Sequence, residues 1–565
     1  MSKSKSHNLA DRIVNASLIV GLAHICLKFA GLIQVKFATH YLEPFLYEPI
    51  MVVAFTGVIN SLFLIGEEVI GPTFLTIFMQ EREDKGEQGA WDYANVVLSF
   101  HSLLLLFVVG AVFCFPDFFI KLFTTWNMQD NPERYKLLRL SLRVLAPGLF
   151  FLSLASTTYK LLNGYKKFFL AAFGDASTKI CVVLGLVIGM WGFGLDHRAL
   201  FAGLLIGCAA KLLTHIIGLW PKRHFFRISW NWRNPAFQKM LLLMLPLLGG
   251  IIFAKVRDNF NNIYVLTHLR EGGVLMANDL GRRLYSSIQW LVPYALQIAL
   301  FPFLCELVSQ KDKDRLGQVL GSSCRMMLSL FVPMATCLCL LGMPIAILLF
   351  WSGKTGLEVA ARAGLSTACY VTVLPAAAVE CVLMQGYFAE QKTMAVTAIG
   401  LFASMLSVIF SYVVVVYFQA GAIASLLAVA LGFVVSRYLK SLMLSLYLQR
   451  STPIFKGSDI SLFFVKLILL SALTGIVTWL VSNAANYILP DGLDRALNAL
   501  HDGAESVVVS RLKLAFRLML SGIGAGVAFI VGAFLFRVEE AKQMLVWIWQ
   551  KVGNKLPGML KIGRK

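Results

Sequence analysis

Long apolar segments separated by short polar stretches follow one another along most of the chain. Most of these segments contain about 20 residues or more, which is the length that a helix needs to cross the hydrocarbon core of a membrane. Each segment is predicted to be a helix, because open strands leave backbone groups unpaired in hydrocarbon. The pattern predicts an all-α polytopic membrane protein with about fourteen transmembrane helices. The predicted spans are 16–42, 50–79, 92–115, 140–162, 168–192, 198–220, 239–267, 284–305, 323–351, 362–388, 393–417, 420–447, 460–486 and 511–536.

A short internal similarity indicates that the spans form two related halves. Asn163-Gly164-Tyr165 ends the fourth predicted span, and Gln385-Gly386-Tyr387 ends the tenth, six spans later. Repeated halves are common in secondary transporters, which bind their substrate between them. The predicted organisation is an N-terminal lobe of six helices at 1–220, a C-terminal lobe of six helices at 221–450, two additional spans at 451–537 and an amphipathic basic tail at 538–565.

Composition and charge agree with lipid as the surrounding medium. Of the 565 residues, 58% are hydrophobic and only 15% are charged, whereas about a quarter of the residues in soluble proteins are charged. A net charge of +20 in a soluble protein would suggest nucleic acid as a partner. Here Lys and Arg gather in alternate loops, which predicts that these loops and both termini are cytoplasmic. Membrane lipids are therefore the expected partners, and nucleic acid is not.

The sequence contains few residues in patterns typical of an enzyme or a metal site. The ten cysteines lie almost entirely in apolar stretches and form no CxxC pair, which favours buried thiols. The motifs GxSxG, Walker A and HExxH are absent. The nearest approach to a metal-binding pair is Asp312 and Asp314, in a loop of alternating charge that favours solvation. No cofactor is expected, and transport would draw on a coupling ion, the membrane potential or a downhill substrate gradient.

Charged residues inside the first two predicted spans are candidates for function, because a charge in hydrocarbon is costly. Lys28 lies near the middle of the first span, and Gln34 follows it. Two interpretations of Lys28 stay open, namely a cation facing a central cavity and a partner of a carboxylate. Glu67 and Glu68 lie in the second span, where one could pair with Lys28 and the other could carry a coupling ion or form a hydrogen bond.

The seventh predicted span is the richest in polar residues. Pro246, Gly249 and Gly250 favour a break or close packing in its first part. The polar residues that follow either line water within the membrane or lie in a loop because the span ends early. They are Lys255, Arg257, Asp258, Asn259, Asn261 and Asn262.

The eighth predicted span begins with two arginines, Arg282 and Arg283. Arginine suits a diphosphate, because it stays charged and donates paired hydrogen bonds. The alternative is that both arginines anchor the helix at the membrane surface.

Several short stretches in order along 16–450 carry a family resemblance. They are Leu162-Asn163-Gly164, Asn261-Asn262, Gly272-Gly273, Arg283-Leu284, Phe301-Pro302-Phe303-Leu304, Gly386-Tyr387-Phe388-Ala389 and Lys392-Thr393, together with Glu68. In these stretches the chain resembles the MurJ (MviN) lipid II flippases of the multidrug/oligosaccharidyl-lipid/polysaccharide exporter superfamily.

The resemblance implies a function and a site. It implies flipping of undecaprenyl-diphosphate-linked peptidoglycan precursor, lipid II, from the cytoplasmic to the periplasmic leaflet of the bacterial inner membrane, by alternating access around a cationic cavity. This activity serves cell wall biogenesis and cell shape, with the cell-wall synthesis machinery as a further partner. Lys28 and Arg283 occupy two of the family's cationic positions, whereas Gln34 and the pair Phe63-Leu64 stand where the family has arginines.

The predicted substrate-binding residues are therefore a set of eight. Among them, Lys255 and Arg257 would supply the positive charge that the absent family arginines do not. Three alternatives stay open: an exporter of another polyprenyl-linked glycan, an intramembrane enzyme acting on lipid-linked sugars, and a scaffold. Glu48 is the one candidate for an acid that the resemblance places early in the second span. The eight residues are Lys28, Gln34, Glu68, Lys255, Arg257, Asp258, Asn262 and Arg283.

Overall fold

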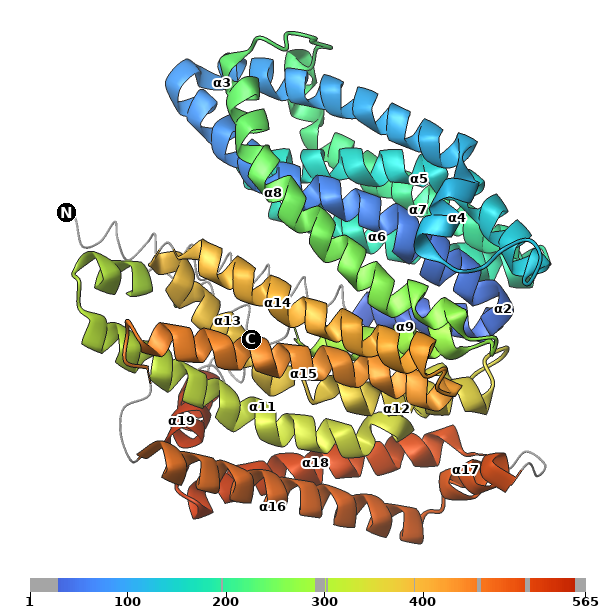
Figure 1. Cartoon of the computed structure of the whole chain (residues 1–565), viewed down its shortest axis with the longest axis vertical. Coiled ribbons are helices and arrows are strands. Elements are labelled where there is room, and N and C mark those ends of the chain that lie inside the picture. The colour runs from blue at the N-terminus through green and yellow to red at the C-terminus, as the bar shows by residue number, and fades with distance from the viewer. Residues whose placement is uncertain are drawn as a thin grey trace, which may run out of the picture. The chain divides into compact units, whose positions relative to one another are not determined.

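The computed structural model describes residues 29–194, 197–289, 300, 303–390, 392–454, 459–502 and 509–553, and within these ranges it is helical and contains no strand (Figure 1). Nine of its helices are long and apolar enough to cross a membrane, or up to eleven if two sharply bent helix pairs each count as one span. The prediction of an all-α polytopic membrane protein is confirmed. The count of fourteen is not, since the predicted first and eighth spans lie partly outside the described residues.

The described chain forms two compact units. The first contains the described residues up to Asp279 with Phe350–Val359 and Ser411–Leu426, and the second contains the rest. The predicted lobe boundaries at 220 and 450 stay predictions. The helices of the first unit are the segment 29–41, α2 (Pro44–Tyr47), α3 (Asn60–Cys114), α4 (Pro116–Phe123), α5 (Pro132–Gly164), α6 (Phe168–Leu186), α7 (His197–Leu219), α8 (Pro235–Asn259) and the start of α9 (Val274–Gln289).

The second unit is built mainly from the later helices. Its core packs residues of α11, α12, α13 and α15 around buried aromatic side chains such as Phe331, Tyr370 and Tyr387. Its helices are the rest of α9, and most or all of α11 (Lys313–Phe350), α12 (Leu357–Val371), α13 (Leu374–Ala389), α14 (Thr393–Tyr412), α15 (Ala422–Gln449), α16 (Asp459–Ile488), α17 (Leu493–Asp502), α18 (Arg511–Leu535) and α19 (Glu539–Gly553).

The helical path also contains turns of other types. π-Helical turns, which are frequent at functional sites, occur at Glu48–Ile59, Val187–Gly192, Phe260–Tyr264 and Val413–Tyr417. Short 3₁₀ turns occur at Trp220–Phe225 and Leu266–His268.

The predicted second and third spans are joined by a kink rather than a loop. The helical path runs from Pro44 to Cys114 and turns at Gly86, whose φ of 71° lies in the left-handed region that glycine adopts readily. Tyr165, directly after α5, donates a hydrogen bond to Glu87 beside the kink at 2.5 Å, and Lys222 lies 2.8 Å from the same carboxylate. Burial and the Glu87 carboxylate raise the pKa of the Tyr165 phenol. These contacts hold the kink against the ends of α5 and α7.

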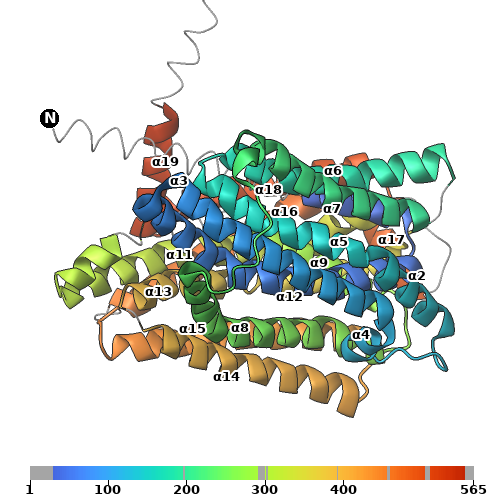
Figure 2. The ribbon, with the colours of Figure 1, turned by 90° about the horizontal axis from the view of Figure 1, so that it is seen from above.

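Glycines allow α6 and α7 to pack closely, and Figure 2 shows both helices beside α5. A β-carbon on Gly207 of α7 would lie 2.8 Å from the carbonyl oxygen of Thr178, and one on Gly203 would lie 3.2 Å from the Val182 Cα. Small residues permit such close approach of helices in membranes. As a result, polar side chains on α7 meet the backbones of α5 and α6 directly.

Helix α8 changes direction by 45° between Pro235–Leu245 and Leu248–His268. The bend lies between these two parts, where Pro246 supplies no backbone N–H for a helical hydrogen bond. Added β-carbons on Gly249 and Gly250 would meet no atom of the described residues within 4 Å. The break that the sequence favours is therefore present, and close packing does not explain these two glycines.

The C-terminal helices are tied together by buried charge and apolar contacts. Helices α16 and α18 run side by side in the second unit (Figure 1). Arg517 of α18 donates to Ser482 Oγ at 2.8 Å and to Asp491 Oδ2 at 3.2 Å. The predicted tail is helical over α19, which packs through Val538 and Ala541, whereas 554–565 lie outside the described residues. Its position at a membrane surface stays a prediction.

We expect Gly207→Val to destabilise the first unit. The larger side chain would overlap the Thr178 carbonyl, and overpacking of this kind costs about 1–3 kcal/mol. Thermal unfolding of the detergent-solubilised protein measures the effect. Gly526→Val in α18 is the matched control, because an added β-carbon there meets nothing within 4 Å among the described atoms. Equal melting temperatures for the two variants would contradict the close α6–α7 contact.

Candidate functional site

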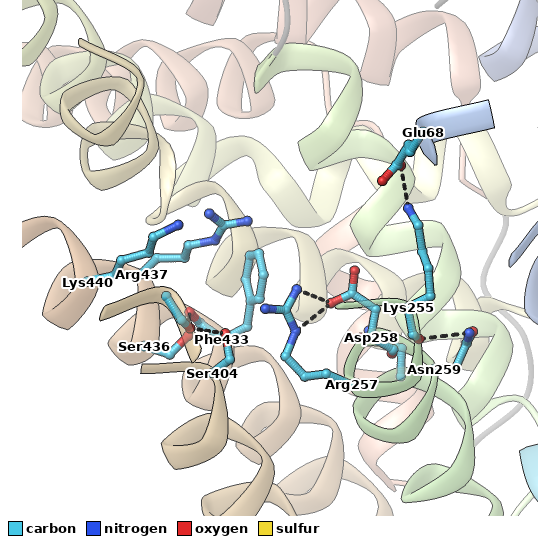
Figure 3. Close-up of polar contacts among 12 residues, drawn as sticks. Glu68, Lys255, Arg257, Asp258, Asn259, Ser404, Phe433, Ser436, Arg437 and Lys440 are labelled. Carbon is cyan, nitrogen blue, oxygen red and sulfur yellow. Dashed lines mark hydrogen bonds and ion pairs between the residues drawn. The ribbon is translucent and has the colours of Figure 1, made fainter. Parts of the chain in front are cut away.

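The charged part of α8 pairs with α3 in the first unit (Figure 3). Lys255 Nζ lies 2.6 Å from Glu68 Oε1, with 44% of the Glu68 side chain exposed and 16% of the Lys255 side chain. Glu68 therefore pairs with a predicted site residue of span seven. Lys28, the other partner that the sequence suggested, lies outside the described residues.

The next charges on α8 neutralise each other. Asp258 Oδ1 accepts hydrogen bonds from Arg257 Nε at 3.1 Å and Nη2 at 2.8 Å. Asn262 donates to the Asp258 carbonyl at 2.6 Å, and Asn259 donates to Ser61 Oγ at 2.8 Å. These residues lie in continuous helical backbone, so the alternative of a loop after an early helix end is wrong.

The first helix contributes less to this arrangement. Gln34 lies half-buried in the helical segment 29–41. Phe63 is buried on α3, and its ring lies 5.1 Å from Lys211 Nζ. The two positions at which the sequence resemblance implies arginines thus carry an amide and an apolar ring in this protein.

Glu48, which the sequence analysis named as a candidate acid, binds the first residues of α9. Its buried carboxylate accepts hydrogen bonds from the backbone N–H groups of Gly273 at 2.8 Å and Met276 at 3.2 Å, at the start of α9. Arg134 lies 3.7 Å away, and Tyr47 donates to Asp279 Oδ2 at 2.9 Å. A carboxylate at a helix N-terminus is stabilised by the unpaired N–H groups there. Glu48 therefore fixes the start of the helix that carries Arg282 and Arg283.

The arginines of α9 belong to the second unit. Arg283 is half-buried, and its carbonyl accepts hydrogen bonds from the hydroxyl groups of Ser286 and Ser287. The Arg282 guanidinium lies 5.9 Å from the centre of the Phe433 ring, and the Arg437 guanidinium lies 5.2 Å from the same centre. Cations gain free energy over an aromatic face. Phe433 thus brings two guanidinium groups together from α9 and α15.

A buried carboxylate completes this cluster. Glu380 of α13 is 5% exposed and contacts Arg437 Nη1 through both oxygens, at 2.9 and 2.7 Å. Lys440 Nζ lies 2.5 Å from Glu380 Oε1 (Figure 3 shows Lys440, Arg437 and Phe433). Three cations and one carboxylate leave an excess of positive charge among the helices of this unit. Sequence analysis named none of these residues as site candidates, although Glu380 lies inside the predicted span 362–388 and both Arg437 and Lys440 lie inside 420–447.

Metal-binding and catalytic arrangements are not found where the structure describes the chain. No group of three or more His, Cys, Asp or Glu side chains that could hold a metal occurs within the described ranges. Asp312 instead accepts a hydrogen bond from the Arg315 backbone at 3.0 Å and caps the start of α11. This geometry agrees with a solvated loop at Asp312.

A helical polytopic fold with ionisable side chains held inside its spans is typical of membrane transporters. Comparison with known proteins specifies the family: the profile of the lipid II flippase MurJ family matches residues 45–490. The chain belongs to the lipid II flippase MurJ family. The family match and the membrane-length helices make it a multi-pass membrane protein, as the sequence indicated.

Individual relatives are distant. A probable lipid II flippase MurJ of Rhizobium meliloti (strain 1021) is 24% identical over 338 residues, which cover 58% of this chain and 62% of that protein. The corresponding Haemophilus influenzae protein (strain ATCC 51907 / DSM 11121 / KW20 / Rd) is 23% identical over 385 residues, which cover 66% of this chain and 73% of the relative. The match to the Rhizobium protein thus spans less than two thirds of its length.

Solved structures show the same fold. A lipid II flippase MurJ in an inward closed conformation superposes with a TM-score of 0.67 and 17% identity, covering 92% of this chain and 99% of the other. An inward-facing multidrug resistance MATE family transporter of the MOP superfamily gives a TM-score of 0.60 and 15% identity, covering 77% and 97%. Their sequence identities of 17% and 15% are low, so these two likenesses show the fold alone.

We expect Glu380→Ala to destabilise the second unit strongly. The change leaves Arg437 and Lys440 without their buried counter-charge, and breaking a buried pair in this way costs about 3–5 kcal/mol. Thermal unfolding in detergent measures the loss. Glu539→Ala removes an exposed carboxylate of α19 and is the control. A triple variant with Arg437→Met and Lys440→Met added should recover much of the stability, and no recovery would contradict the charge argument.

Proposed function

We propose that this chain moves lipid II from the cytoplasmic to the periplasmic leaflet of the bacterial inner membrane by alternating access, with both termini in the cytoplasm. The observation that carries the proposal is the match of residues 45–490 to a family named for this activity. The membrane-spanning helices and the ionisable residues inside them support it. The product would serve peptidoglycan synthesis, and the cell-wall synthesis machinery would be the neighbouring partner.

Binding of a diphosphate needs cations that can exchange one anionic partner for another. Lys255 is paired with Glu68, and Arg437 is paired with Glu380. When a phosphate replaces the carboxylate beside such a cation, the cation keeps an anionic partner, but the displaced carboxylate loses its cation. The Glu68 side chain is 44% exposed and can then be hydrated, whereas Glu380 is 6% exposed and would be left as a bare buried charge. Lys255 is therefore the proposed exchange position, although Arg437 is the more exposed cation, at 29% against 16%. Arg283 and Lys28 are proposed as further diphosphate ligands.

A second candidate function is export of another polyprenyl-linked glycan. The observation that favours it is the side-chain chemistry at two family arginine positions, which are the half-buried amide Gln34 and the buried ring of Phe63. Fewer cations near these positions would suit a head group that carries less negative charge. Both candidates share the diphosphate and the long lipid, so the substrate itself has to be tested.

Depletion of the protein in its native cells tests the substrate. A non-permeant probe that reacts with lipid II on the outer face of the inner membrane is expected to report a falling signal while the total lipid II pool rises. The control is the same strain after expression of the protein has been restored. An unchanged external signal, in cells without a second flippase, would move the proposal to another lipid-linked glycan.

We expect Arg283→Glu to lower lipid II flipping in proteoliposomes by about 10- to 100-fold, because hydrogen bonds to a charged partner contribute about 1.5–3 kcal/mol. Flipping is measured by the fraction of labelled lipid II that becomes accessible from one side. Arg495→Glu on the exposed face of α17 makes the same charge change and is expected to keep the wild-type rate. Full activity of Arg283→Glu would remove Arg283 from the site.

A further inference from the structure

A buried polar centre lies in the first unit, among α5, α6 and α7. Lys211 and His215 stand one helical turn apart on α7 and are 6% and 0% exposed. Lys211 Nζ lies 2.7 Å from Asp175 Oδ1 on α6. Ionisable groups at such a depth in a membrane-spanning unit are costly and are often functional. Its groups belong to α5, α6 and α7, whereas the contacts described above join α8 to α3.

Both ring nitrogens of His215 meet hydrogen-bonding groups. Nδ1 lies 3.0 Å from the Ala155 carbonyl oxygen and 3.1 Å from Thr158 Oγ1, both on α5. Nε2 lies 3.2 Å from the Ala171 carbonyl oxygen on α6. A neutral imidazole carries one N–H, whereas an imidazolium carries two. The two carbonyl oxygens are therefore both satisfied by the ring only when it is protonated.

Thr158 allows the same pocket to hold the neutral ring. Its hydroxyl lies 3.1 Å from His215 Nδ1, and it can also donate to the carbonyl oxygens of Ala155, at 3.0 Å, and Leu154, at 3.2 Å. In the neutral state Nε2–H donates to Ala171 and the Thr158 hydroxyl donates to Nδ1. In the charged state Nδ1–H donates to Ala155 and the hydroxyl turns to Leu154. The two patterns differ by one proton and one hydroxyl rotation.

The surrounding backbone holds the His215 ring in place, so protonation changes the partner of the Thr158 hydroxyl and does not rotate the ring. A β-carbon on Gly174 of α6 would collide with His215 Nε2, which shows how closely the α6 backbone covers the ring. A ring packed against backbone on both sides cannot turn over to exchange its nitrogens. Protonation therefore adds a link from α7 to α5 and leaves the link to α6 unchanged.

Charged groups around the ring set how readily it takes a proton. Lys211 carries a positive charge that opposes an imidazolium at His215, and the Asp175 carboxylate that is paired with Lys211 offsets this charge. Glu67 and Glu68 from α3, Lys160 from α5 and Lys179 from α6 act on the same centre through Glu67 and Asp175. His101 of α3 lies against Thr157 of α5. Any movement that separates Asp175 from Lys211 changes the stability of a charge on His215.

We propose that His215, together with the Asp175–Lys211 pair, is a proton-binding site through which a proton gradient acts on transport; this rests on the proposed flippase function. One proton from water on one side binds Nδ1, the Thr158 hydroxyl turns to Leu154, and the link from α7 to Ala155 forms. Release of the proton to the other side reverses each change, and no other bond is made or broken. Sodium is a poor alternative, because the Lys211 ammonium already occupies the Asp175 carboxylate.

Flipping of labelled lipid II by the full-length protein in proteoliposomes tests the proposal, with the pH set separately inside and outside. For one proton per cycle, a gradient of about one pH unit shifts the ratio of flipping in the two directions by up to about tenfold. His215→Gln keeps one donor and one acceptor but binds no proton, and is expected to flip with no response to the gradient. His101→Gln changes another buried histidine, which is 5% exposed, and should respond like the wild type.

The outcomes separate the two proposals. A wild-type protein that does not flip lipid II under any condition contradicts the proposed function. A wild-type protein that flips but ignores the pH gradient, or a His215→Gln variant that still responds, overturns the proton site.

A direct measurement covers the case in which His215→Gln fails to fold. In ¹⁵N-histidine spectra of the detergent-solubilised wild type, the resonance pair of His215 is expected to move from the neutral to the doubly protonated pattern as the pH falls. The pair is assigned by spectra of single-histidine substitutions that do fold, His101→Gln first. A His215 pair that stays in one neutral tautomer until the protein unfolds overturns the proposal.

Discussion

The helix packing depends on contacts in which a charge inside an apolar helix meets an opposite charge within the same compact unit. Removing a charge from water costs free energy, so an unpaired charge would destabilise the packing of its helix in the bundle. Four buried or half-buried pairings are of this kind, and each joins segments that are far apart in the sequence. They are Glu68 with Lys255, Asp175 with Lys211, Glu380 with Arg437 and Lys440, and Asp491 with Arg517.

These pairings differ in which species could bind there. The pair on α3 and α8 is open enough for an outside anion to replace the Glu68 carboxylate. In the pair on α6 and α7, the Asp175 side chain is 40% exposed, whereas Lys211 and the neighbouring His215 are buried. The full burial of His215, rather than the exposure of the carboxylates, therefore distinguishes the proposed coupling site from the proposed substrate contact.

The sequence predicts the helical membrane class, the transporter family and the helical charges of α8, because apolar length and charge inside apolar segments are local properties. It does not predict that Glu68 meets Lys255, since the choice of partner depends on how α3 docks on α8. Gly86 turned a predicted loop into a kink, which only its backbone angle reveals. Glu380 and Arg437 could have been named as candidate site residues from the sequence, because both interrupt apolar segments. The remaining predicted residues stay predictions, and Lys28 lies outside the described chain.

The bend in α8 has a consequence for biosynthesis. The part before the bend, Pro235–Leu245, is far shorter than the roughly 20 residues that a bilayer requires, so the charged part must enter the membrane with it. Each Lys, Arg or Asp near the centre of an inserting helix opposes insertion by about 2.5–3.5 kcal/mol. Helix α3 precedes α8 in the chain, so Glu68 leaves the ribosome first and is already in the bilayer when Lys255 arrives. Helix α8, which would insert poorly alone, can therefore pair with α3, because α3 is inserted first.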